Sequence, residues 1–417
     1  MSLQKEIAAI KEYSNRIYMG MTRKPEGQLC HPYIVPGTKA YTDQLWDWDS
    51  WLTDIAVRQI MLDNQDANPA YMECEKGCVL NFLEHTEADG SIPILIRPST
   101  EGIQMRDHTK NVHKPCLAQH LLFVVQTNGN DATWAKPYMK QLCAFVDFYR
   151  TNCRHEATGL YYWLDDGAIG VDDDPCVFYR PEKSSAAIYL NCLMYKELLA
   201  TAQILEMLDM DSSVYAQEAE HLKKAIQEQM WDERNGSFYS VDLNLLPILP
   251  KEEKWLHSGS PRHYHCLVQK IDTWSNFMAL WAQIATPEQA ERIVKENLLR
   301  EDLFWAPYGV RTLSKKEKMY RVIKSGNPSC WQGPVWGICN YLCFRGLQKY
   351  GYIDEAKELA MKTISLFGRD VLENGDLHEY YDPETGEGVN NLGFQNWNLL
   401  VNNMIAWLEG RETLHEV

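Results

Sequence analysis

Apolar residues recur at helical spacing through most of the chain. Between residues 3 and 20, Ile7, Ile10, Tyr13 and Ile17 lie three or four positions apart among charged residues, which is typical of a helix with one buried face. The same pattern predicts eleven more helices, near residues 49–63, 68–86, 114–127, 132–152, 184–208, 212–231, 273–285, 287–299, 333–349, 353–368 and 394–409. The sequence therefore predicts a mainly helical protein.

The predicted helices form pairs. Short links join the two helices of a pair, and long loops near 87–113, 154–182, 232–272, 300–330 and 369–393 separate the pairs. Short and long connections that alternate at a regular period indicate a repeat-built architecture. We predict an all-α fold in which residues 1–417 form one catalytic domain, an (α/α)6 barrel. This is a toroid of six helical hairpins, closed by packing of the N-terminal helix against the last one.

Two further expectations follow from a closed ring. The helices that follow the long loops are the more apolar ones and should be the inner helices, so all long loops should lie on one rim. An open helical solenoid is the alternative arrangement. The residues with unusual chemistry fall on the predicted rim: Trp46, Trp48, Asp49, Arg106, Lys114, Asp172, Arg180, Trp331, Gln332, Trp336, Glu379 and Tyr380. Acids and aromatics that converge on one face favour an active site there.

Composition narrows the class of partner. The 41 Lys and Arg against 57 Asp and Glu give a net charge of −16, which disfavours nucleic acid and anionic membranes as partners. The 14 Trp and 22 Tyr suit sugar rings, but they suit a large core equally well. No run of 18 apolar residues occurs, so no membrane span is predicted. The sequence gives no indication of the oligomeric state.

The twelve cysteines are expected to be reduced thiols. Several of them, such as Cys192, lie within apolar helical patterns, where a thiol behaves as a small hydrophobic group. Cys74 and Cys78 are four residues apart, but they lack the further ligands that a zinc site needs. Charged residues interrupt the first apolar stretch, so we expect no secretory signal and a cytoplasmic location. No metal or other cofactor is expected.

Two loops each carry a candidate catalytic acid. Asp172 begins a run of three Asp before Pro175, and Glu379 lies between His378 and Tyr380. In an inverting glycosidase one carboxylic acid protonates the leaving oxygen, and a carboxylate on the opposite side activates water. If the irregular segment before residue 49 counts as the first loop, the loops near 154–182 and 369–393 are the third and the sixth. In a six-hairpin ring these two loops face each other across the centre, which suits such a pair. Burial, or repulsion from the next two Asp, would raise the pKa of Asp172.

Each candidate also has a purely structural interpretation. Three Asp before a Pro are typical of a solvated turn, and Glu379 can equally be an acid on a surface loop. The Trp residues can equally be core residues. Arg106, Lys114 or Arg180 could receive an acidic aglycone or could serve only in an ion pair.

Five motifs resemble glycoside hydrolase family 63 in order and spacing. They are Trp-Asp-Trp-Asp-Ser at 46–50, Gly-Val-Asp-Asp-Asp-Pro at 170–175, Tyr-Gly-Val-Arg-Thr-Leu-Ser at 308–314, Trp-Gln-Gly-Pro-Val-Trp at 331–336 and Glu-Tyr-Tyr-Asp-Pro-Glu-Thr-Gly at 379–386. The resemblance runs from about residue 40 to the C-terminus. It is greatest to the compact bacterial members, which include mannosylglycerate and glucosylglycerate hydrolases, and extends more distantly to trehalases.

The resemblance implies an (α/α)6 barrel and inverting hydrolysis of an α-glycoside without a catalytic metal. It places the general acid on Asp172 and the general base on Glu379, and it implies that Asp49, Trp331 and Gln332 hold the non-reducing sugar. Two departures stand out. Two Asp replace the commoner Asn-Ser after Asp172, which leaves open which Asp donates the proton, and Trp-Gln replaces the frequent Trp-Arg at 331–332.

The working hypothesis is an inverting glycosidase that cleaves a terminal α-glucoside or α-mannoside of a small carbohydrate substrate. Two alternatives come from other functional classes. A sugar isomerase or epimerase on the same toroid would use His263 and His265 as proton shuttles. A non-catalytic sugar-binding protein would keep the Trp residues and tolerate loss of both acids. The sugar, the linkage and the aglycone are open at this stage.

Overall fold

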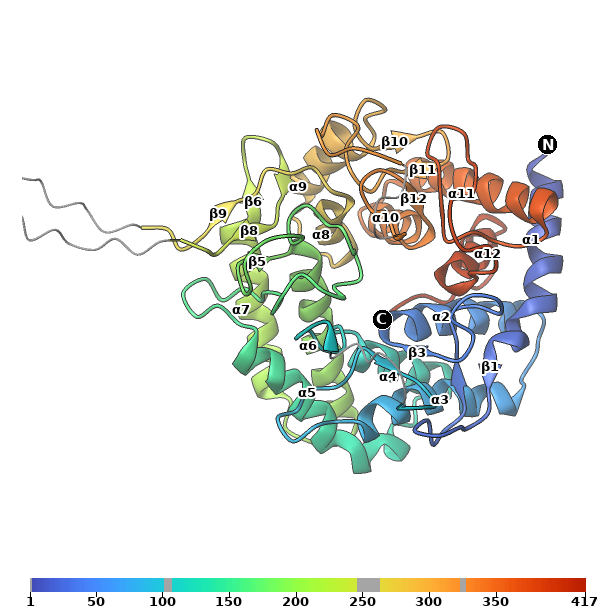
Figure 1. The fold of residues 1–417 in the computed structure, drawn as a ribbon, viewed down its shortest axis with the longest axis horizontal. Helices are drawn as coiled ribbons and strands as arrows, with labels where there is room; N and C mark the ends of the chain where they lie inside the picture. The colour runs from blue at the N-terminus through green and yellow to red at the C-terminus, as the bar shows by residue number, and fades with distance from the viewer. Residues whose placement is uncertain (1, 101–106, 246–262, 323–327) are drawn as a thin grey trace, which may run out of the picture.

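The computed structural model describes residues 2–100, 107–245, 263–322 and 328–417, and within these ranges the fold is mainly helical (Figure 1). The α-helices are α1 (Leu3–Ile17), α2 (Asp47–Asp63), α3 (Pro69–Glu84), α4 (Leu117–Thr127), α5 (Met139–Asn152), α6 (Ile188–Met207), α7 (Ser213–Met230), α8 (Met278–Trp281), α9 (Pro287–Arg292), α10 (Gly337–Lys349), α11 (Ile353–Asn374) and α12 (Val401–Leu408). Each α-helix lies within or closely overlaps a predicted helical range. None of those in the described ranges is long and apolar enough to cross a bilayer.

Several predicted helices consist of two shorter segments. The 3₁₀ helix η3 (Thr133–Tyr138) precedes α5, η4 (Trp274–Phe277) precedes α8, and η6 (Asn396–Leu400) precedes α12. A π-helical segment, η5 (Ile293–Leu298), follows α9, and a 3₁₀ turn, η1 (Tyr18–Met21), follows α1. The apolar pattern does not reveal these changes, because an α turn differs by less than one residue from a 3₁₀ turn or a π turn and the segments are only four to six residues long.

Six inner elements form a closed ring. The helix α2 contacts α4, α4 contacts α6, α6 contacts α8 and α8 contacts α10. The ring closes because α10 contacts η6, and η6 with α12 packs against α2 (Figure 1). Five of them, α4, α6, α8, α10 and η6, follow the long loops, as predicted. The sixth is α2, for which no inner position was predicted. The residues of the inner elements are buried almost throughout, for example Ile188–Tyr195 on α6.

The other helices pack outside this ring. The helix α3 contacts α4, α7 packs along α6, and α11 packs along α10. The N-terminal helix α1 packs along α11 and also contacts α12, as ring closure requires. It does so with the apolar face of Ile7, Ile10 and Tyr13, which are 7%, 2% and 2% exposed. An amphipathic helix with one apolar stripe is stable only when that stripe is covered.

Short antiparallel strands, which were not predicted from the sequence, lie within the loops and pair with one another. They are β1 (Thr22–Arg23), β2 (Tyr33–Ile34), β3 (Leu45–Trp46), β4 (Leu95–Ile96), β5 (Ser185–Ala186), β6 (Trp231–Asp232), β7 (Ser237–Phe238), β8 (Val241–Asp242), β9 (Leu267–Val268), β10 (Trp305–Ala306), β11 (Gly309–Val310), β12 (Val335–Trp336) and β13 (Tyr380–Tyr381). They pair as β1–β2, β3–β4, β5–β8–β9, β6–β7, β10–β11 and β12–β13. Strands of two residues are too short to show an alternating pattern.

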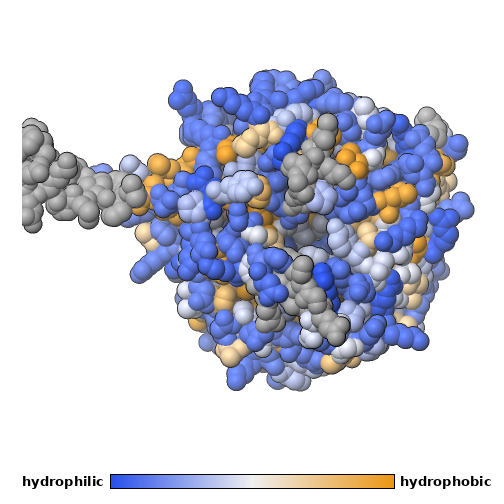
Figure 2. Space-filling model, in the orientation of Figure 1, coloured by the Kyte–Doolittle hydropathy of each residue, from blue (hydrophilic) through white to orange (hydrophobic). Residues whose placement is uncertain are grey.

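The strands fix the loops at the start of the inner helices. For example, β12 leads directly into α10 and pairs with β13, with Trp336 opposite Tyr380. This pairing holds the loop of residues 379–386 beside the loop of residues 331–336. In the view of Figure 2 the surface is mainly hydrophilic and is hollowed near its centre. All twelve cysteines are free thiols, and only Cys30 and Cys143 among them are not buried.

Candidate active site

The loops that enter the inner helices surround one pocket, with a volume of about 310 Å³. It lies at the N-terminal ends of α2, α10 and η6. Eight residues that the sequence singled out line it: Trp46, Trp48, Asp49, Lys114, Asp172, Trp331, Trp336 and Glu379. Two carboxyl groups from loops about two hundred residues apart in sequence, those of Asp172 and Glu379, thus lie in the same cavity.

Stacked tryptophans form one wall of the pocket. The rings of Trp331 and Trp336 are 3.9 Å apart at their centroids and inclined by 11°. Trp48 lies 6.4 Å from Trp331 and 5.6 Å from Trp397. Each of these four residues is at least 96% buried, so the cluster belongs to the core and to the pocket at once. Trp331 also stacks with Trp274, and Trp336 with Tyr380, so the cluster forms a rigid apolar boundary of the pocket.

Asp172, Asp173 and Asp174 lie in three different environments. Of the three, Asp172 alone lines the pocket. The carboxylate of Asp174 accepts a hydrogen bond from the Cys176 N–H at 2.8 Å and caps the turn that follows. Asp173 contacts the fifth loop instead. Its Oδ1 accepts a hydrogen bond from the Trp331 N–H at 2.6 Å.

Gln332 also contacts the acid loop and does not line the pocket. Its Nε2 donates to the backbone oxygen of Asp173 at 2.9 Å, and its side chain is buried. The structure therefore gives Gln332 a different contact from the sugar contact that the family resemblance implied. Together the bonds to Asp173 fasten the third loop to the fifth and leave Asp172 facing the cavity.

Gly170 has a steric role beside the acid. Its φ is +87°, and a Cβ at this position would lie 2.5 Å from Lys114 Cε and 2.6 Å from Trp48 Cζ2. Both the left-handed backbone and the close contacts require glycine here. The Gly in the Gly-Val-Asp motif is thus needed to bring Asp172 against the wall of the pocket.

Glu379 is held by two amide groups. It is 6% exposed, and its Oε2 accepts hydrogen bonds from Asn390 Nδ2 at 3.1 Å and Asn391 Nδ2 at 2.6 Å. Its backbone N–H donates to the Asn390 oxygen at 2.8 Å. Glu379 directly precedes β13, so the strand pairing with β12 holds its backbone beside the loop of residues 331–336.

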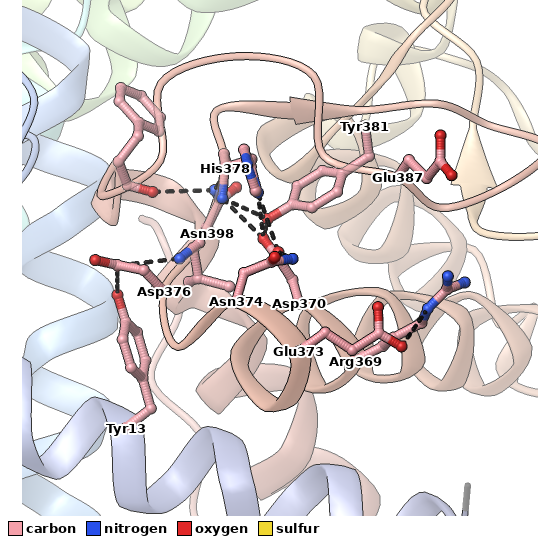
Figure 3. Close-up of polar contacts among 12 residues, drawn as sticks. Tyr13, Arg369, Asp370, Glu373, Asn374, Asp376, His378, Tyr381, Glu387 and Asn398 are labelled. Carbon is pink, nitrogen blue, oxygen red and sulfur yellow. Dashed lines mark hydrogen bonds and ion pairs between the residues drawn. The ribbon is translucent and has the colours of Figure 1, made fainter.

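The buried carboxylate of Asp370 binds His378 and Tyr381, which lie just before and just after Glu379 in the sequence. Asp370, near the C-terminal end of α11, accepts hydrogen bonds from the backbone N–H of His378 at 2.9 Å and from the Tyr381 hydroxyl at 2.7 Å (Figure 3). The Nδ1 of His378 lies 3.0 Å from both Asp370 oxygens. Burial opposes ionisation of Asp370, but these hydrogen bonds keep its pKa below the ordinary value. In the same loop, Asp376 accepts a hydrogen bond from the Tyr13 hydroxyl at 2.5 Å.

The pKa values of both candidate acids are raised. Burial raises the pKa of Asp172 to about 6, against a hydrogen bond with Ser329 and the charge of Lys114, which lower it. Burial raises the pKa of Glu379 to about 7; the negative charge of Asp172 adds to this, and the Asn391 and Asn390 amides oppose it. The pKa of Glu379 thus depends in part on the charge of Asp172, and both pKa values lie near neutral pH.

Asp49 is a third carboxyl group in the pocket. Burial and the charge of Asp47 raise its pKa to about 8, although Lys114 and a hydrogen bond from Asn396 lower it. The Asn396 Nδ2 donates to Asp49 Oδ1 at 2.5 Å. Asp49 is therefore largely protonated at neutral pH and can donate a hydrogen bond as well as accept one.

The predicted cationic residues have other partners or lie elsewhere. The Nζ of Lys114 lies 3.0 Å from Asp47 Oδ1 and 4.9 Å from the Trp48 ring, with 2% of its side chain exposed. Its charge is thus neutralised by Asp47. Arg180 does not line the pocket and pairs with Asp242. Arg106 lies outside the described residues.

Other predicted residues also lie away from the cavity. The Tyr380 hydroxyl donates to the Pro328 oxygen at 2.6 Å, and its ring stacks on Trp336 at 5.0 Å, behind the pocket wall. His263 and His265, the shuttles of the isomerase alternative, are both exposed and do not line the pocket. Their positions therefore disfavour the isomerase mechanism.

Six further residues line the pocket that the sequence analysis did not select: Tyr41, Ala168, Gly170, Ser329, Phe394 and Trp397. Tyr41 lies five residues before Trp46, and Phe394 and Trp397 lie at the start of the last inner helix. The N-terminal ends of the inner helices are expected at the rim that carries the acids. Aromatic residues at those ends could therefore have been predicted to line the pocket. Asn390 and Asn391 gave no sequence signal, because Asn is common in any loop.

Comparison with known proteins adds a family match. Residues 42–398 match the family described as the mannosylglycerate hydrolase MGH1-like glycoside hydrolase domain. Among curated proteins, the chain is 29% identical over 136 residues to mannosylglycerate hydrolase MGH1 of Selaginella moellendorffii, which covers 33% of this chain and 25% of that protein. It is 26% identical over 270 residues to the cytosolic neutral trehalase of Kluyveromyces lactis, covering 61% of this chain and 32% of the trehalase. The match thus spans about a quarter to a third of these relatives.

A solved structure has a similar fold. The GH63 mannosylglycerate hydrolase from Thermus thermophilus, in complex with glucose, has a TM-score of 0.68 with 17% sequence identity and covers 93% of this chain and 98% of its own. A second structure of that enzyme is in complex with Tris and D-glycerate. At this level of identity the likeness concerns the fold.

Proposed function

Because this chain belongs to the mannosylglycerate hydrolase MGH1-like glycoside hydrolase family, we propose that it cleaves a terminal α-glucoside or α-mannoside from a small substrate with inversion of configuration. The family match agrees with the resemblance to glycoside hydrolase family 63 that the five motifs predicted. The closed ring of inner helices supports the proposal that the domain is an (α/α)6 barrel with its active site at the loop rim.

One observation supports the mechanism above all others. Asp172 and Glu379 line the same cavity, and each has a raised pKa. In the proposed reaction, protonated Asp172 donates its proton to the glycosidic oxygen as the bond to the anomeric carbon breaks. The carboxylate of Glu379 takes a proton from a water molecule, whose oxygen attacks the anomeric carbon from the opposite face. The products are the inverted free sugar and the alcohol of the aglycone.

The environment of Glu379 fits the role of base. The Asn390 and Asn391 amides donate to its carboxylate, and hydrogen bonds to the charged form of an acid stabilise that form. Burial raises the pKa of Asp172 to about 6, so a larger fraction of this group carries a proton near pH 6 than an ordinary aspartic acid would. A glycosidic oxygen that accepts a hydrogen bond from Asp172 would favour this protonated form further, because it bonds to the neutral acid.

The rest of the pocket fits one sugar and a small aglycone. Its volume of about 310 Å³ is at the lower end of the range of roughly 300–1,000 Å³ for small-molecule sites. We propose that the sugar ring lies against the tryptophan wall of the pocket and that Asp49 binds its hydroxyl groups. The relatives named as mannosylglycerate hydrolases make glycerate a candidate aglycone, so the first substrates to test are mannosylglycerate and glucosylglycerate.

The stereochemistry of the product tests the mechanism. We expect the first sugar released from an α-glycoside to be the β-anomer, because water attacks the face opposite the leaving group. Proton NMR in the first minutes of the reaction, before mutarotation, distinguishes the two anomers. The substrates should be α-glucosides and α-mannosides with neutral and with acidic aglycones, and trehalose. Trehalose should give one β- and one α-glucose, because only the attacked anomeric carbon is inverted. Release of the α-anomer of the transferred sugar from any other substrate would exclude inversion, and binding without turnover on all substrates would exclude the proposed activity.

The pH dependence of activity should be bell-shaped. Hydrolysis needs one proton on the pair, because both a carboxylic acid and a carboxylate take part. With pKa values of about 6 and about 7 for Asp172 and Glu379, kcat/KM should fall below about pH 6, where both groups become protonated. It should fall again above about pH 7, where the pair loses its last proton. A profile that stays flat from pH 4 to pH 9 would contradict a pair of titrating carboxyls.

A further inference from the structure

Asn391 connects the candidate base to a second residue that lines the pocket, Tyr41. Its Nδ2 lies 2.6 Å from Glu379 Oε2 and 3.3 Å from the Tyr41 hydroxyl oxygen. A primary amide carries two N–H donors, so one group can serve both acceptors. Tyr41 comes from the first loop and itself lines the cavity. The amide therefore ties the sixth loop to the first at the position of the base.

Asn391 has a left-handed backbone conformation. Its φ is +43°, a left-handed conformation that costs most residues energy and that Asn tolerates better than others. Strained backbone that a structure retains beside a catalytic group often serves that group. The residue as a whole is exposed, whereas Asn390 is buried. Asn391 can thus be replaced without opening a cavity in the core.

The two amides leave Glu379 with one oxygen directed elsewhere. Both Asn390 Nδ2 and Asn391 Nδ2 donate to Oε2, which occupies the lone pairs of that oxygen. The other oxygen, Oε1, receives neither of these two bonds, and in the proposed reaction it is the oxygen that takes a proton from water. We infer that Asn391 is a positioning residue, which orients the Glu379 carboxylate and keeps it ionised for its role as base. This inference rests on the proposed function, since it assigns the action of Asn391 to the base of that reaction.

The hydrogen bond from Asn391 lowers the pKa of Glu379. Asn391 is the largest of the influences that lower the pKa of this buried acid. Its removal should raise the pKa of Glu379 by about half to one unit. The productive form then loses population at acid and neutral pH. At alkaline pH, Glu379 is ionised in either case and the loss disappears.

The test compares two variants at Asn391 with matched variants at Asn130. Asn391→Gly removes the side chain and keeps the left-handed backbone, and Asn391→Asp keeps the shape but places a second carboxylate beside Glu379. Asn130 is also exposed and left-handed, with φ +61°, and it lies in the link between α4 and η3, which does not border the pocket. Asn130→Gly and Asn130→Asp therefore control for the backbone and for the added charge.

We expect kcat/KM of Asn391→Gly to be about three- to tenfold below wild type at pH 5, with the deficit vanishing by pH 9. Asn391→Asp should show the larger deficit at pH 5 to 6, since a like charge raises the pKa further. Both Asn130 variants should match wild type throughout. A purely structural role would lower the rate by the same factor at every pH. That outcome, or an unchanged rate at every pH, would overturn the inference.

A second measurement does not depend on turnover. The pKa of Glu379 can be read by ¹³C NMR of protein labelled at the Glu side-chain carboxyl, with Glu379→Gln to assign the resonance. The pKa should rise from wild type to Asn391→Gly and again to Asn391→Asp. If wild type hydrolyses no glycoside, the proposed function fails while this titration still tests Asn391. If the titration is unchanged in both variants, the inference about Asn391 fails whatever the activity.

Discussion

Replacement of Glu379 by Gln should abolish hydrolysis of every glycoside that the protein accepts, with a loss in kcat of about 10⁴-fold, the upper end for general acid–base catalysis. The attacking water needs a base whatever the leaving group is, so activated substrates should not restore the rate. Gln has the shape of Glu, and its carbonyl oxygen can still accept the hydrogen bonds from Asn390 and Asn391. The fold and substrate binding should therefore be preserved.

The measurement is kcat on the best substrate, with the melting temperature and substrate affinity as controls. Binding of the substrate should remain within a few-fold of wild type, because the variant changes only the charge of one group. A rate within tenfold of wild type at neutral pH would remove Glu379 from the role of base. If the variant loses activity and its melting temperature also falls strongly, the loss can come from unfolding. The role of Glu379 is then tested by measuring its pKa in the folded wild type by ¹³C NMR.

Asp172→Asn should lose about 10³-fold in kcat on a glycoside with an alkyl leaving group, within the range for loss of a general acid. It should lose much less on a glycosyl fluoride or a dinitrophenyl glycoside, because these leaving groups depart without a proton. The ratio of the two rates is therefore the diagnostic quantity. It should change by more than a hundredfold in Asp172→Asn and should stay constant in Glu379→Gln, where the base is missing for both substrates.

A neighbouring variant decides which of the three Asp residues donates the proton. Asp173 contacts Trp331 and Gln332, so Asp173→Asn should disturb the loop and lower both rates by a similar factor. Asp131→Asn, at an exposed position in the link between α4 and η3, should change neither rate. If Asp173→Asn, and not Asp172→Asn, changes the ratio of the rates, the acid is Asp173 and the assignment to Asp172 is wrong.

The pocket also shows why opposite interpretations of one residue can both be correct. Trp331 and Trp336 are core residues by burial and pocket residues by position. Lys114 lines the cavity but is ion-paired with Asp47, so its position alone does not make it a receptor for an acidic group. For such residues the sequence supports two interpretations, because residue type does not reveal the partner.

The sequence by itself determined the helices, their alternation with long loops and the loops on which the acids lie. These features depend on periodicity and turn residues that are close together in the chain, and local contacts favour the same conformation in any fold. It also indicated the inner helices, because a helix that is apolar on most sides has to be buried.

Only the tertiary structure decided which side chains meet. Asp172, Asp173 and Asp174 are chemically identical and adjacent, and what separates them is a bond from Asp173 to Trp331, 158 residues away. Asn391 lies 350 residues from Tyr41 in the sequence, and Lys114 lies 67 residues from Asp47. A local sequence pattern does not predict contacts between residues so far apart. Side-chain direction, burial and pKa depend on what packs against a residue from elsewhere in the chain, and that is fixed only when the ring closes.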